Sequence, residues 1–378
     1  MDWPDMQKLK VMTVVGTRPE IIRLAPTIKL LDTCTDHVLV HTGQNYDYTL
    51  NEVFFKDLGL RSPDYFMNAD VSSLGAALGS IITTTERLIT ETKPDAFLIL
   101  GDTNSCMSAI MAKRMHVPVF HMEAGNRSFD ENVPEETNRR IIDHAADYNL
   151  AYTEHGRRNL LAEGLHPSRI IVTGSPMAEV LDANENQIAA SDVLASQGLS
   201  PQGYFLVSLH REENVDYPSR LELALEALQA VRTAYGLPVL ISTHPRTRKR
   251  LEALPDALKE GLVFHPPFGF NDYVKLQIEA KAVLSDSGTI SEESSILGFP
   301  AITLRDFIER PEALDTGSIV TAGLAPQSVL SALDLVIRLP RPRPPVDYQV
   351  TDTSTRVVSF IIGTVHSHQR RQGLFARD

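Results

Sequence analysis

Cysteine is scarce in this chain of 378 residues, which has only Cys34 and Cys106, in separate segments. Two isolated cysteines provide neither a disulfide framework nor a zinc-binding spacing. The 12 histidines show no H-E-x-x-H or other metal-ligand spacing. The glycine turn after the first expected strand lacks the G-x-G-x-x-G pattern of a nicotinamide site. We therefore expect neither a metal nor NAD as a cofactor.

Excess positive charge and long apolar runs are also missing. The formal net charge is −12, which argues against nucleic acid or an anionic membrane surface as a partner. No stretch is apolar enough to span a bilayer, so we expect no membrane insertion. The acidic start at residues 1–5 lacks the apolar run of a signal peptide. These features predict a cytoplasmic protein, in which a few arginines gathered at one site could still bind an anionic small molecule.

The chain alternates short β-rich runs with amphipathic stretches, a pattern typical of βαβ units and parallel sheets. Its length favours two domains. In the first series we expect strands at 10–15, 37–41, 96–100, 117–121, 148–151 and 170–172, with a helix at 21–31. In the second series we expect strands at 204–209, 238–242, 262–264, 282–285 and 301–304, with a helix at 221–235.

The two series predict two Rossmann-like domains, at residues 1–175 and 176–350. A final helix within 351–367 could pack back on the first domain, and the tail at 368–378 is expected to be disordered. Several polar motifs come directly after expected strands. Ligands of open α/β sheets bind outside the carboxyl ends of the strands, so we predict parallel sheets facing across a cleft that holds the site.

The motif Gly16–Arg23 joins the first strand to the first helix. A helix N-terminus favours an anion, and Arg18 and Arg23 add positive charge, so the motif predicts anion binding. The alternative is a surface turn with solvated arginines.

A second turn, at residues 285–293, joins a buried strand to a helix through small residues. Backbone N–H groups of Ser287, Gly288 and Thr289 could hold a diphosphate, and Glu293 could accept hydrogen bonds from ribose hydroxyls. The alternative is a capping box at the start of the helix, and both could hold together.

Acidic side chains form a third group. Asp102 and Glu123 each follow a buried strand, where a carboxylate needs partners. Glu135 follows Pro134 at a helix start, and Arg139 lies one turn later. Several acids in one cleft could provide one acid and one base. For Glu135 and its neighbour, the alternative is ordinary support of a helix N-terminus.

Two histidines follow expected strands of the second series. His210 could contact a phosphate or transfer a proton, and His244 is similar. The alternative for both is a structural histidine.

The motifs in their order resemble those of the non-hydrolysing UDP-N-acetylglucosamine 2-epimerase family, whose fold is GT-B. The resemblance covers nearly the whole chain, up to the motif at 309–312. It rests on Gly16-Thr17-Arg18-Pro19-Glu20, Gly101-Asp102-Thr103, Glu123-Ala124-Gly125, Pro134-Glu135-Glu136-Thr137-Asn138-Arg139 and Asp286-Ser287-Gly288-Thr289-Ile290-Ser291-Glu292-Glu293.

The resemblance implies roles for individual positions and a homodimer. The implied catalytic residues are Asp102, Glu123, Glu135 and His210. The resemblance matches Arg18, Ser287 and Glu293 to UDP-binding positions, Arg139 to an active-site arginine and Tyr273 to an aromatic near the uracil. The further candidate substrate-binding residues are Arg23, His244, Gly288, Thr289 and Arg310. The implied reaction is elimination of UDP to a 2-acetamidoglycal, followed by its re-addition with C2 protonated on the other face.

Three segments resemble one subgroup more closely: residues 44–48, 123–127 and 210–214. Arg23 also stands where commoner members have lysine, and the departure at 44–48 leaves regulation by a second UDP-sugar in doubt. The subgroup converts UDP-2-acetamido-2,6-dideoxy-L-talose to UDP-N-acetyl-L-fucosamine for capsule or O-antigen synthesis, and this is the substrate we expect. The alternatives are a UDP-GlcNAc/UDP-ManNAc 2-epimerase, a hydrolysing epimerase, a GT-B glycosyltransferase and a non-catalytic UDP-sugar sensor.

Overall fold

The computed structural model describes residues 8–43, 55–131 and 133–372. The chain forms two compact units, residues 1–183 with 350–378 (unit 1) and residues 184–349 (unit 2). Unit 1 extends past the expected limit at residue 175 because α7 (Met177–Ala183) packs against α1 (Arg18–Cys34).

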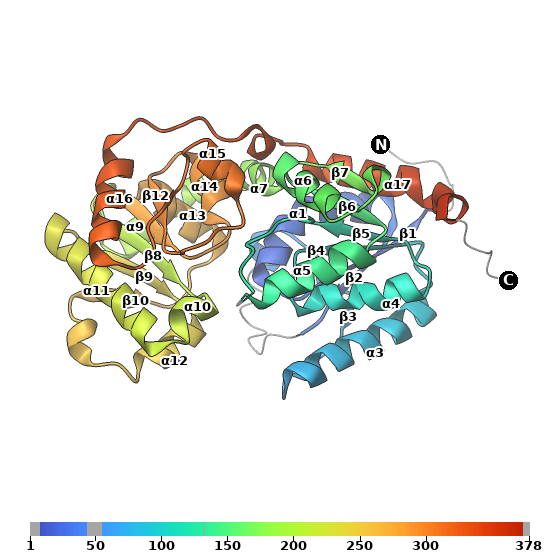
Figure 1. Ribbon diagram of the computed structural model, residues 1–378, viewed down its shortest axis with the longest axis horizontal. Coiled ribbons are helices and arrows are strands. Elements are labelled where there is room, and N and C mark those ends of the chain that lie inside the picture. Colours follow the sequence, from blue (N-terminus) through green and yellow to red (C-terminus); the bar gives the residue numbers. More distant parts are fainter. Residues whose placement is uncertain (1–7, 44–54, 132, 373–378) are drawn as a thin grey trace. The chain divides into compact units, whose positions relative to one another are not determined.

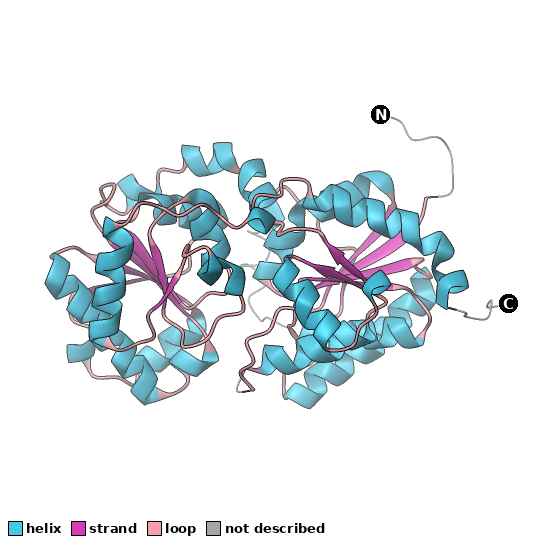
Figure 2. Ribbon diagram, turned by 45° about the horizontal axis from the view of Figure 1, so that its top comes forward, coloured by secondary structure: helices cyan, strands magenta, loops and turns pink. Residues whose placement is uncertain are grey.

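Unit 1 is built on a parallel sheet of seven strands in the order β3-β2-β1-β4-β5-β6-β7. The strands are β1 (Lys10–Val15), β2 (Asp36–His41), β3 (Tyr65–Phe66), β4 (Ala96–Leu100), β5 (Val119–Met122), β6 (Tyr148–Ala151) and β7 (Ile170–Val172). Central strands such as β4 are buried along their whole length, because helices cover both faces of a parallel sheet. Figure 2 shows these helices on the two sides of the strands.

The described helices of unit 1 are α1, α3 (Leu74–Thr92), α4 (Ser108–Arg114), α5 (Pro134–Ala145), α6 (Glu154–Ala162), α7 and α17 (Thr353–Gln372), with 3₁₀ turns at Asn104–Met107 and Pro167–Arg169. The last helix, α17, returns to unit 1 and packs against α1 (Figure 1). Its first residue, Thr353, donates a hydrogen bond to the carbonyl of Ser175 at 3.1 Å.

Unit 2 repeats the arrangement with six parallel strands in the order β10-β9-β8-β11-β12-β13. They are β8 (Phe205–Leu209), β9 (Val239–Thr243), β10 (Leu262–His265), β11 (Ala282–Ser285), β12 (Ala301–Thr303) and β13 (Val320–Thr321). Both sheets reverse direction of winding next to their first strand, which is the doubly wound Rossmann topology. The predicted fold class is confirmed.

The described helices of unit 2 are α8 (Glu185–Ala190), α9 (Val193–Ser196), α10 (Glu212–Val215), α11 (Pro218–Tyr235), α12 (Pro245–Leu251), α13 (Phe270–Glu279), α14 (Ile290–Leu297), α15 (Pro311–Asp315) and α16 (Pro326–Arg338), with 3₁₀ turns at Asp256–Leu258 and Val346–Tyr348. Helices α11 and α16 pack together on one apolar core. Gly236 ends α11 with φ of 65°, a conformation that favours glycine.

Several expected element limits differ from the observed ones, and two of these differences have a clear physical reason. Strand β5 begins at Val119 and not at Val117, since Pro118 has no N–H to give to a strand pair. The last helix continues to Gln372, so residues 368–372 of the expected disordered tail are helical. Buried His368 contacts the ring of Tyr148 there, at 5.7 Å between centroids, and this contact favours the extra turn.

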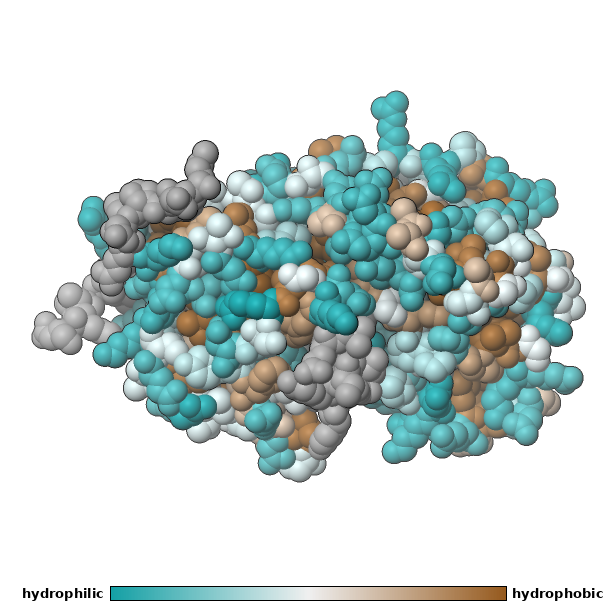
Figure 3. Space-filling model, turned by 180° about the vertical axis from the view of Figure 1, so that it is seen from behind, coloured by the Kyte–Doolittle hydropathy of each residue, from teal (hydrophilic) through white to brown (hydrophobic). Residues whose placement is uncertain are grey.

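On the face that Figure 3 shows, hydrophilic side chains cover most of the surface and hydrophobic ones lie between them. Scattered exposed apolar residues are normal for globular proteins. Within the described ranges, no helix is both long and apolar enough to cross a membrane.

Candidate functional site

In unit 1, three of the predicted site residues follow strands at or next to the point where the winding direction reverses. Arg18 follows β1 and is half-buried at the first position of α1. Asp102 follows β4, and Glu123 follows β5. Parallel strands place their carboxyl ends at one edge of the sheet, which explains why residues so distant in sequence become neighbours.

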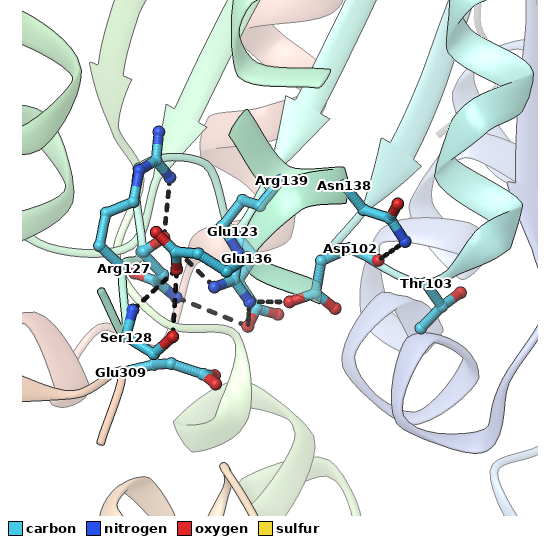
Figure 4. A network of polar contacts seen from close by, with 12 residues as sticks. Asp102, Thr103, Glu123, Arg127, Ser128, Glu136, Asn138, Arg139 and Glu309 are labelled. Carbon is cyan, nitrogen blue, oxygen red and sulfur yellow. Dashed lines mark hydrogen bonds and ion pairs between the residues drawn. The ribbon is translucent and has the colours of Figure 1, made fainter. Parts of the chain in front are cut away.

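Two buried arginines hold the two strand-end carboxylates. Arg23 of α1 forms an ion pair with Glu123, and Arg139 of α5 forms one with Asp102. Arg139 Nη2 also lies 3.8 Å from Glu123 Oε1, and Figure 4 shows its guanidinium reaching both acids. Buried charges need such partners. The structure therefore brings together four of the predicted residues, all with side chains at most 15% exposed.

Glu123 also has an unusual backbone, with φ of 65°. A residue with a side chain rarely adopts this left-handed conformation, which costs about 1–3 kcal/mol and clusters at functional sites. Two residues on, Gly125 has φ of 80°, and a Cβ there would lie 2.2 Å from the carbonyl oxygen of Gly156. Glycine is required at 125, and the loop that carries Glu123 is tightly constrained.

The two glutamates at the start of α5 differ. Glu135 lies half-buried in the first turn, about one helical turn before Arg139. Glu136 is buried and accepts a hydrogen bond from the backbone N–H of Ser128 at 2.9 Å (Figure 4). It also pairs with Arg140 at 2.9 Å. Glu136 therefore supports the start of α5, as the alternative interpretation proposed. The catalytic role of Glu135 stays a prediction.

Sequence reasoning missed Glu20, a buried carboxylate in α1. It accepts hydrogen bonds from the backbone N–H of Gly16 at 2.6 Å and from the hydroxyls of Thr103 and Ser105. Burial raises the pKa of Glu20, and these hydrogen bonds oppose the rise only in part. Glu20 links the turn after β1 to the turn after β4. Its place within the Gly16–Arg23 motif was the only available signal.

Unit 2 has a buried acid after β11, the strand that corresponds to β4 of unit 1. Asp286, directly after β11, is fully buried and accepts hydrogen bonds from the backbone N–H groups of His210 and Arg211 at 3.0–3.1 Å. The ring Nδ1 of His210 lies 3.1 Å from Asp286 Oδ1. Burial raises the pKa of Asp286, but His210 and the backbone donors outweigh burial and hold it below its ordinary value. The carboxylate orients the histidine.

The turn after Asp286 consists of small, half-buried residues. The Ser287 hydroxyl lies 2.9 Å from the Thr289 hydroxyl and accepts from the Thr289 N–H at 3.3 Å. Helix α14 begins at Ile290, and Thr289 caps it without a side-chain hydrogen bond. The capping-box alternative is therefore wrong. A Cβ at Gly288 would lie 3.1 Å from the Arg211 guanidinium, the flexible end of a long side chain.

Glu293 and Tyr273 lie near this turn. Gln277 of α13 donates a hydrogen bond to Glu293 Oε2 at 2.6 Å. Burial, with the nearby negative charges of Glu293 and Asp286, raises the pKa of Tyr273, although a hydrogen bond with Ser208 opposes this. The predicted ribose and uracil residues therefore share one region with the turn at 285–289.

The other two predicted residues of unit 2 have clear structural surroundings. His244 precedes α12 and accepts a hydrogen bond from the Arg246 N–H at 3.3 Å. Its ring centroid lies 6.4 Å from that of His210. Arg310 is buried, with Nη2 3.6 Å from Glu292 Oε2 in α14. His244 therefore belongs with His210, and Arg310 belongs with the helix that follows the small-residue turn.

The residues described by the structure contain no group of three or more histidine, cysteine or acidic side chains that could hold a metal ion.

Two doubly wound parallel sheets, each with ionisable side chains near its point of reversal, define an α/β protein of the GT-B type. Residues 31–362 match the family described as UDP-N-acetylglucosamine 2-epimerase, and the chain belongs to that family. It is thus an isomerase of the nucleotide-sugar 2-epimerase type.

Three relatives illustrate the similarity. A structure titled UDP-N-acetylglucosamine 2-epimerase from Rickettsia bellii is 45% identical, with a TM-score of 0.90, and covers 96% of this chain and 98% of that one. The UDP-N-acetylglucosamine 2-epimerase of Methanocaldococcus jannaschii is 35% identical over 346 residues, 88% of this chain and 93% of the relative. A structure from that organism, in complex with UDP-GlcNAc and UDP, has a TM-score of 0.89 at 34% identity, covering 94% of this chain and 100% of that one.

The third relative carries a different sugar in its name. It is the UDP-2,3-diacetamido-2,3-dideoxy-D-glucuronate 2-epimerase of Pseudomonas aeruginosa, 33% identical over 329 residues, 86% of this chain and 91% of the relative.

Proposed function

We propose that this protein interconverts UDP-GlcNAc and UDP-ManNAc by inverting C2 of the sugar. The names of the relatives from Rickettsia and Methanocaldococcus support this substrate. The structural observation that carries the proposal is the pair of strand-end carboxylates, Asp102 and Glu123, each held by a buried arginine. General acid–base catalysis needs ionisable side chains held at fixed positions near the transferred proton, and these two carboxylates are held in this way.

The reaction we propose begins with loss of the C2 proton to a carboxylate of unit 1. The electron pair of the C–H bond forms a C1–C2 double bond while the C1–O bond to UDP breaks, giving a 2-acetamidoglycal and UDP. UDP then adds back to C1 as C2 takes a proton on its other face. Asp102, Glu123 and Glu135 are the acids and bases we assign, with Arg139 and Arg23 orienting them.

Unit 2 supplies the groups that we assign to UDP. We assign the diphosphate to the turn of Ser287, Gly288 and Thr289, because small-residue turns before helices bind phosphates. The N–H groups of Ser287 and Thr289 donate to the hydroxyls of Ser285 and Ser287, and they would turn to the phosphate on binding. His210, oriented by Asp286 at 3.1 Å, stabilises the negative charge of the leaving phosphate. Glu293 binds the ribose, and Tyr273 lies beside the uracil. Arg18, His244 and Arg310 complete the substrate-binding residues that we propose.

A second candidate substrate is UDP-2-acetamido-2,6-dideoxy-L-talose, the one that we expected from the sequence. Residues 123–127 and 210–214 favour it, and the third supporting segment, 44–48, lies outside the described residues. The named relatives are UDP-GlcNAc 2-epimerases and one diacetamido-glucuronate epimerase, so UDP-GlcNAc replaces it as the first candidate.

A sugar-nucleotide panel read by NMR separates the candidates. We expect UDP-GlcNAc to give UDP-ManNAc, with UDP retained in the product at equilibrium. Turnover of the L-talo substrate alone would favour the second candidate. Free sugar plus UDP would indicate a hydrolase, UDP released only with an acceptor would indicate a transferase, and binding without turnover would indicate a sensor.

A further inference from the structure

We propose that Asp143 is a positioning residue, which holds the loops of Glu123 and Asp102 in the geometry needed for proton transfer. This inference rests on the proposed function, because it requires Glu123 to act on the substrate. Asp143 belongs to α5 and was not among the residues predicted from the sequence.

Asp143 is fully buried, and three residues of β5 and the loop after it contact its carboxylate. Its carboxylate lies 2.9 Å from His121 Nδ1 and 2.8 Å from Arg127 Nη2, and it accepts a hydrogen bond from the Gly125 N–H at 3.1 Å. All three partners lie within four residues of Glu123. One carboxylate therefore fastens the segment on both sides of that glutamate.

His121 extends this attachment to the neighbouring strand end. Its Nε2 lies 2.7 Å from the carbonyl oxygen of Gly101, the residue before Asp102. A carbonyl only accepts hydrogen bonds, so Nε2 carries the hydrogen. The ring lies between the Gly101 carbonyl and the Asp143 carboxylate, so it packs the turn that carries Asp102 against the helix that holds the Glu123 loop.

The backbone of the loop explains why such an attachment is needed. Glu123 and Gly125 both have left-handed backbones, with φ of 65° and 80°. A side-chain-bearing residue stays in this conformation only where its surroundings enforce it. The hydrogen bond from Gly125 to Asp143 lies two residues after Glu123 and supplies that constraint. Without it, the Glu123 carboxylate would move relative to the sugar.

Glu163 offers a matched control in the same network. It contacts Arg127 from the other side, at 2.8 Å to Nε and 2.7 Å to Nη2, and it is only partly buried. Replacing Glu163 by glutamine removes a carboxylate from Arg127. It leaves the bonds from Asp143 to Gly125 and His121 in place.

The first experiment compares the steady-state kinetics of Asp143→Asn and Glu163→Gln with the wild type on UDP-GlcNAc. Misplacing a catalytic group by about 1 Å costs on the order of 100-fold, so we expect kcat of Asp143→Asn to fall by about that factor. KM should change less than about threefold, since this loop is assigned to chemistry and not to UDP. Glu163→Gln should stay near wild type. Equal loss in the two variants, or a loss in KM alone, would overturn the inference.

A double-mutant cycle with Glu123→Asp tests whether Asp143 acts through Glu123. Residues that act as one unit give combined losses smaller than the product of the single losses. We expect that result, and independent, multiplying losses would contradict it. If Asp143→Asn does not fold, His121→Gln replaces it, with the same expectation and the same contrary result.

Failure of the proposed function would look different. In that case the wild type would show no C2 epimerisation of either candidate substrate. Wild-type turnover with an unaffected Asp143→Asn variant would reject this inference alone.

Discussion

The two units share a topology but satisfy their strand-end carboxylates in different ways. In unit 1, Glu123 and Asp102 each pair with a buried arginine. In unit 2, Asp286 is satisfied by two backbone N–H groups and the ring of His210. The unit 1 acids have guanidinium partners and lie beside the left-handed backbone of Glu123, and we assign them to proton transfer. Asp286 orients His210 and its turn, and we assign that histidine and the turn at 287–289 to binding the anionic UDP.

This difference supports different roles for the two units, although they share one topology. Unit 1 would carry out the proton transfer, and unit 2 would bind the UDP leaving group. It also shows why the acids of the two units are not interchangeable. Removing a charge in unit 1 should mainly lower kcat. Removing a charge in unit 2 should weaken UDP binding, or the stabilisation of UDP as it leaves, at least as much as it changes the chemical step. The following predictions test that contrast, from the largest expected effect to the smallest.

Glu123→Gln should lower kcat by about 10³-fold, because general acid–base catalysis contributes about 10²–10⁴-fold. The amide cannot take the C2 proton, and the ion pair with Arg23 is lost. UDP affinity should change little if unit 2 binds the nucleotide. Steady-state turnover and UDP titration calorimetry measure the two quantities. Normal turnover would remove Glu123 from the catalytic set.

Protonation of His41 should destabilise unit 1 in acid. Burial lowers the pKa of His41 from 6.5 to about 4, so the folded state disfavours the charged ring. The unfolded chain takes up this proton below pH 6.5 and the folded chain only near pH 4. Stability from this group is therefore full above pH 6.5 and falls by about 3 kcal/mol as the pH drops to 4.

The variant His41→Asn tests this acid response, because its side-chain oxygen can still accept the Gly43 N–H bond made by His41 Nδ1. Denaturant unfolding between pH 7 and 4 should show a flatter pH slope in the variant. His366→Gln, at an exposed position of α17, is the control and should keep the wild-type slope. An unchanged slope in His41→Asn would contradict the assignment.

Asp286→Asn should lower kcat by about 10²-fold, because His210 loses the carboxylate that orients it. One amide oxygen must also replace two carboxylate oxygens that accept backbone N–H groups. Combined with His210→Gln, the loss should be smaller than the product of the single losses. Asp334→Asn, at an exposed position paired with Arg338, serves as the control. Independent losses would separate Asp286 from His210.

Glu293→Gln should weaken UDP binding about tenfold, or about 1.4 kcal/mol, if the carboxylate binds ribose hydroxyls. Glu279→Gln is the control, since Glu279 pairs with Lys275 on the helix that also carries Gln277. Calorimetry with UDP measures both. Equal affinities for wild type and Glu293→Gln would place the ribose elsewhere.

Most of the fold was predictable because buried parallel strands are short apolar runs between polar turns. Strands β1, β4, β6, β7 and β11 have the predicted limits. The two-residue strands β3 and β13 were missed because so few residues carry no periodic signal. The end of α17 was also missed, since its last turn depends on His368 reaching Tyr148, 220 residues away.

The site was predictable only in part, for a related reason. Strand-end position singled out Asp102, Glu123 and His210, and the family resemblance supplied their roles. Their partners could not be found in this way, because Arg23 and Glu123 are 100 residues apart. Asp143 lies in α5 beyond the motif at 134–139, and only folding brings it to Gly125.

The central claim is that unit 1 exchanges the C2 proton of a UDP-sugar. The most direct test is incubation of the wild-type protein with UDP-GlcNAc in deuterated water, followed by NMR of the product. We expect UDP-ManNAc with deuterium at C2, and loss of that label in Glu123→Gln. Product formed without solvent deuterium at C2 would contradict it.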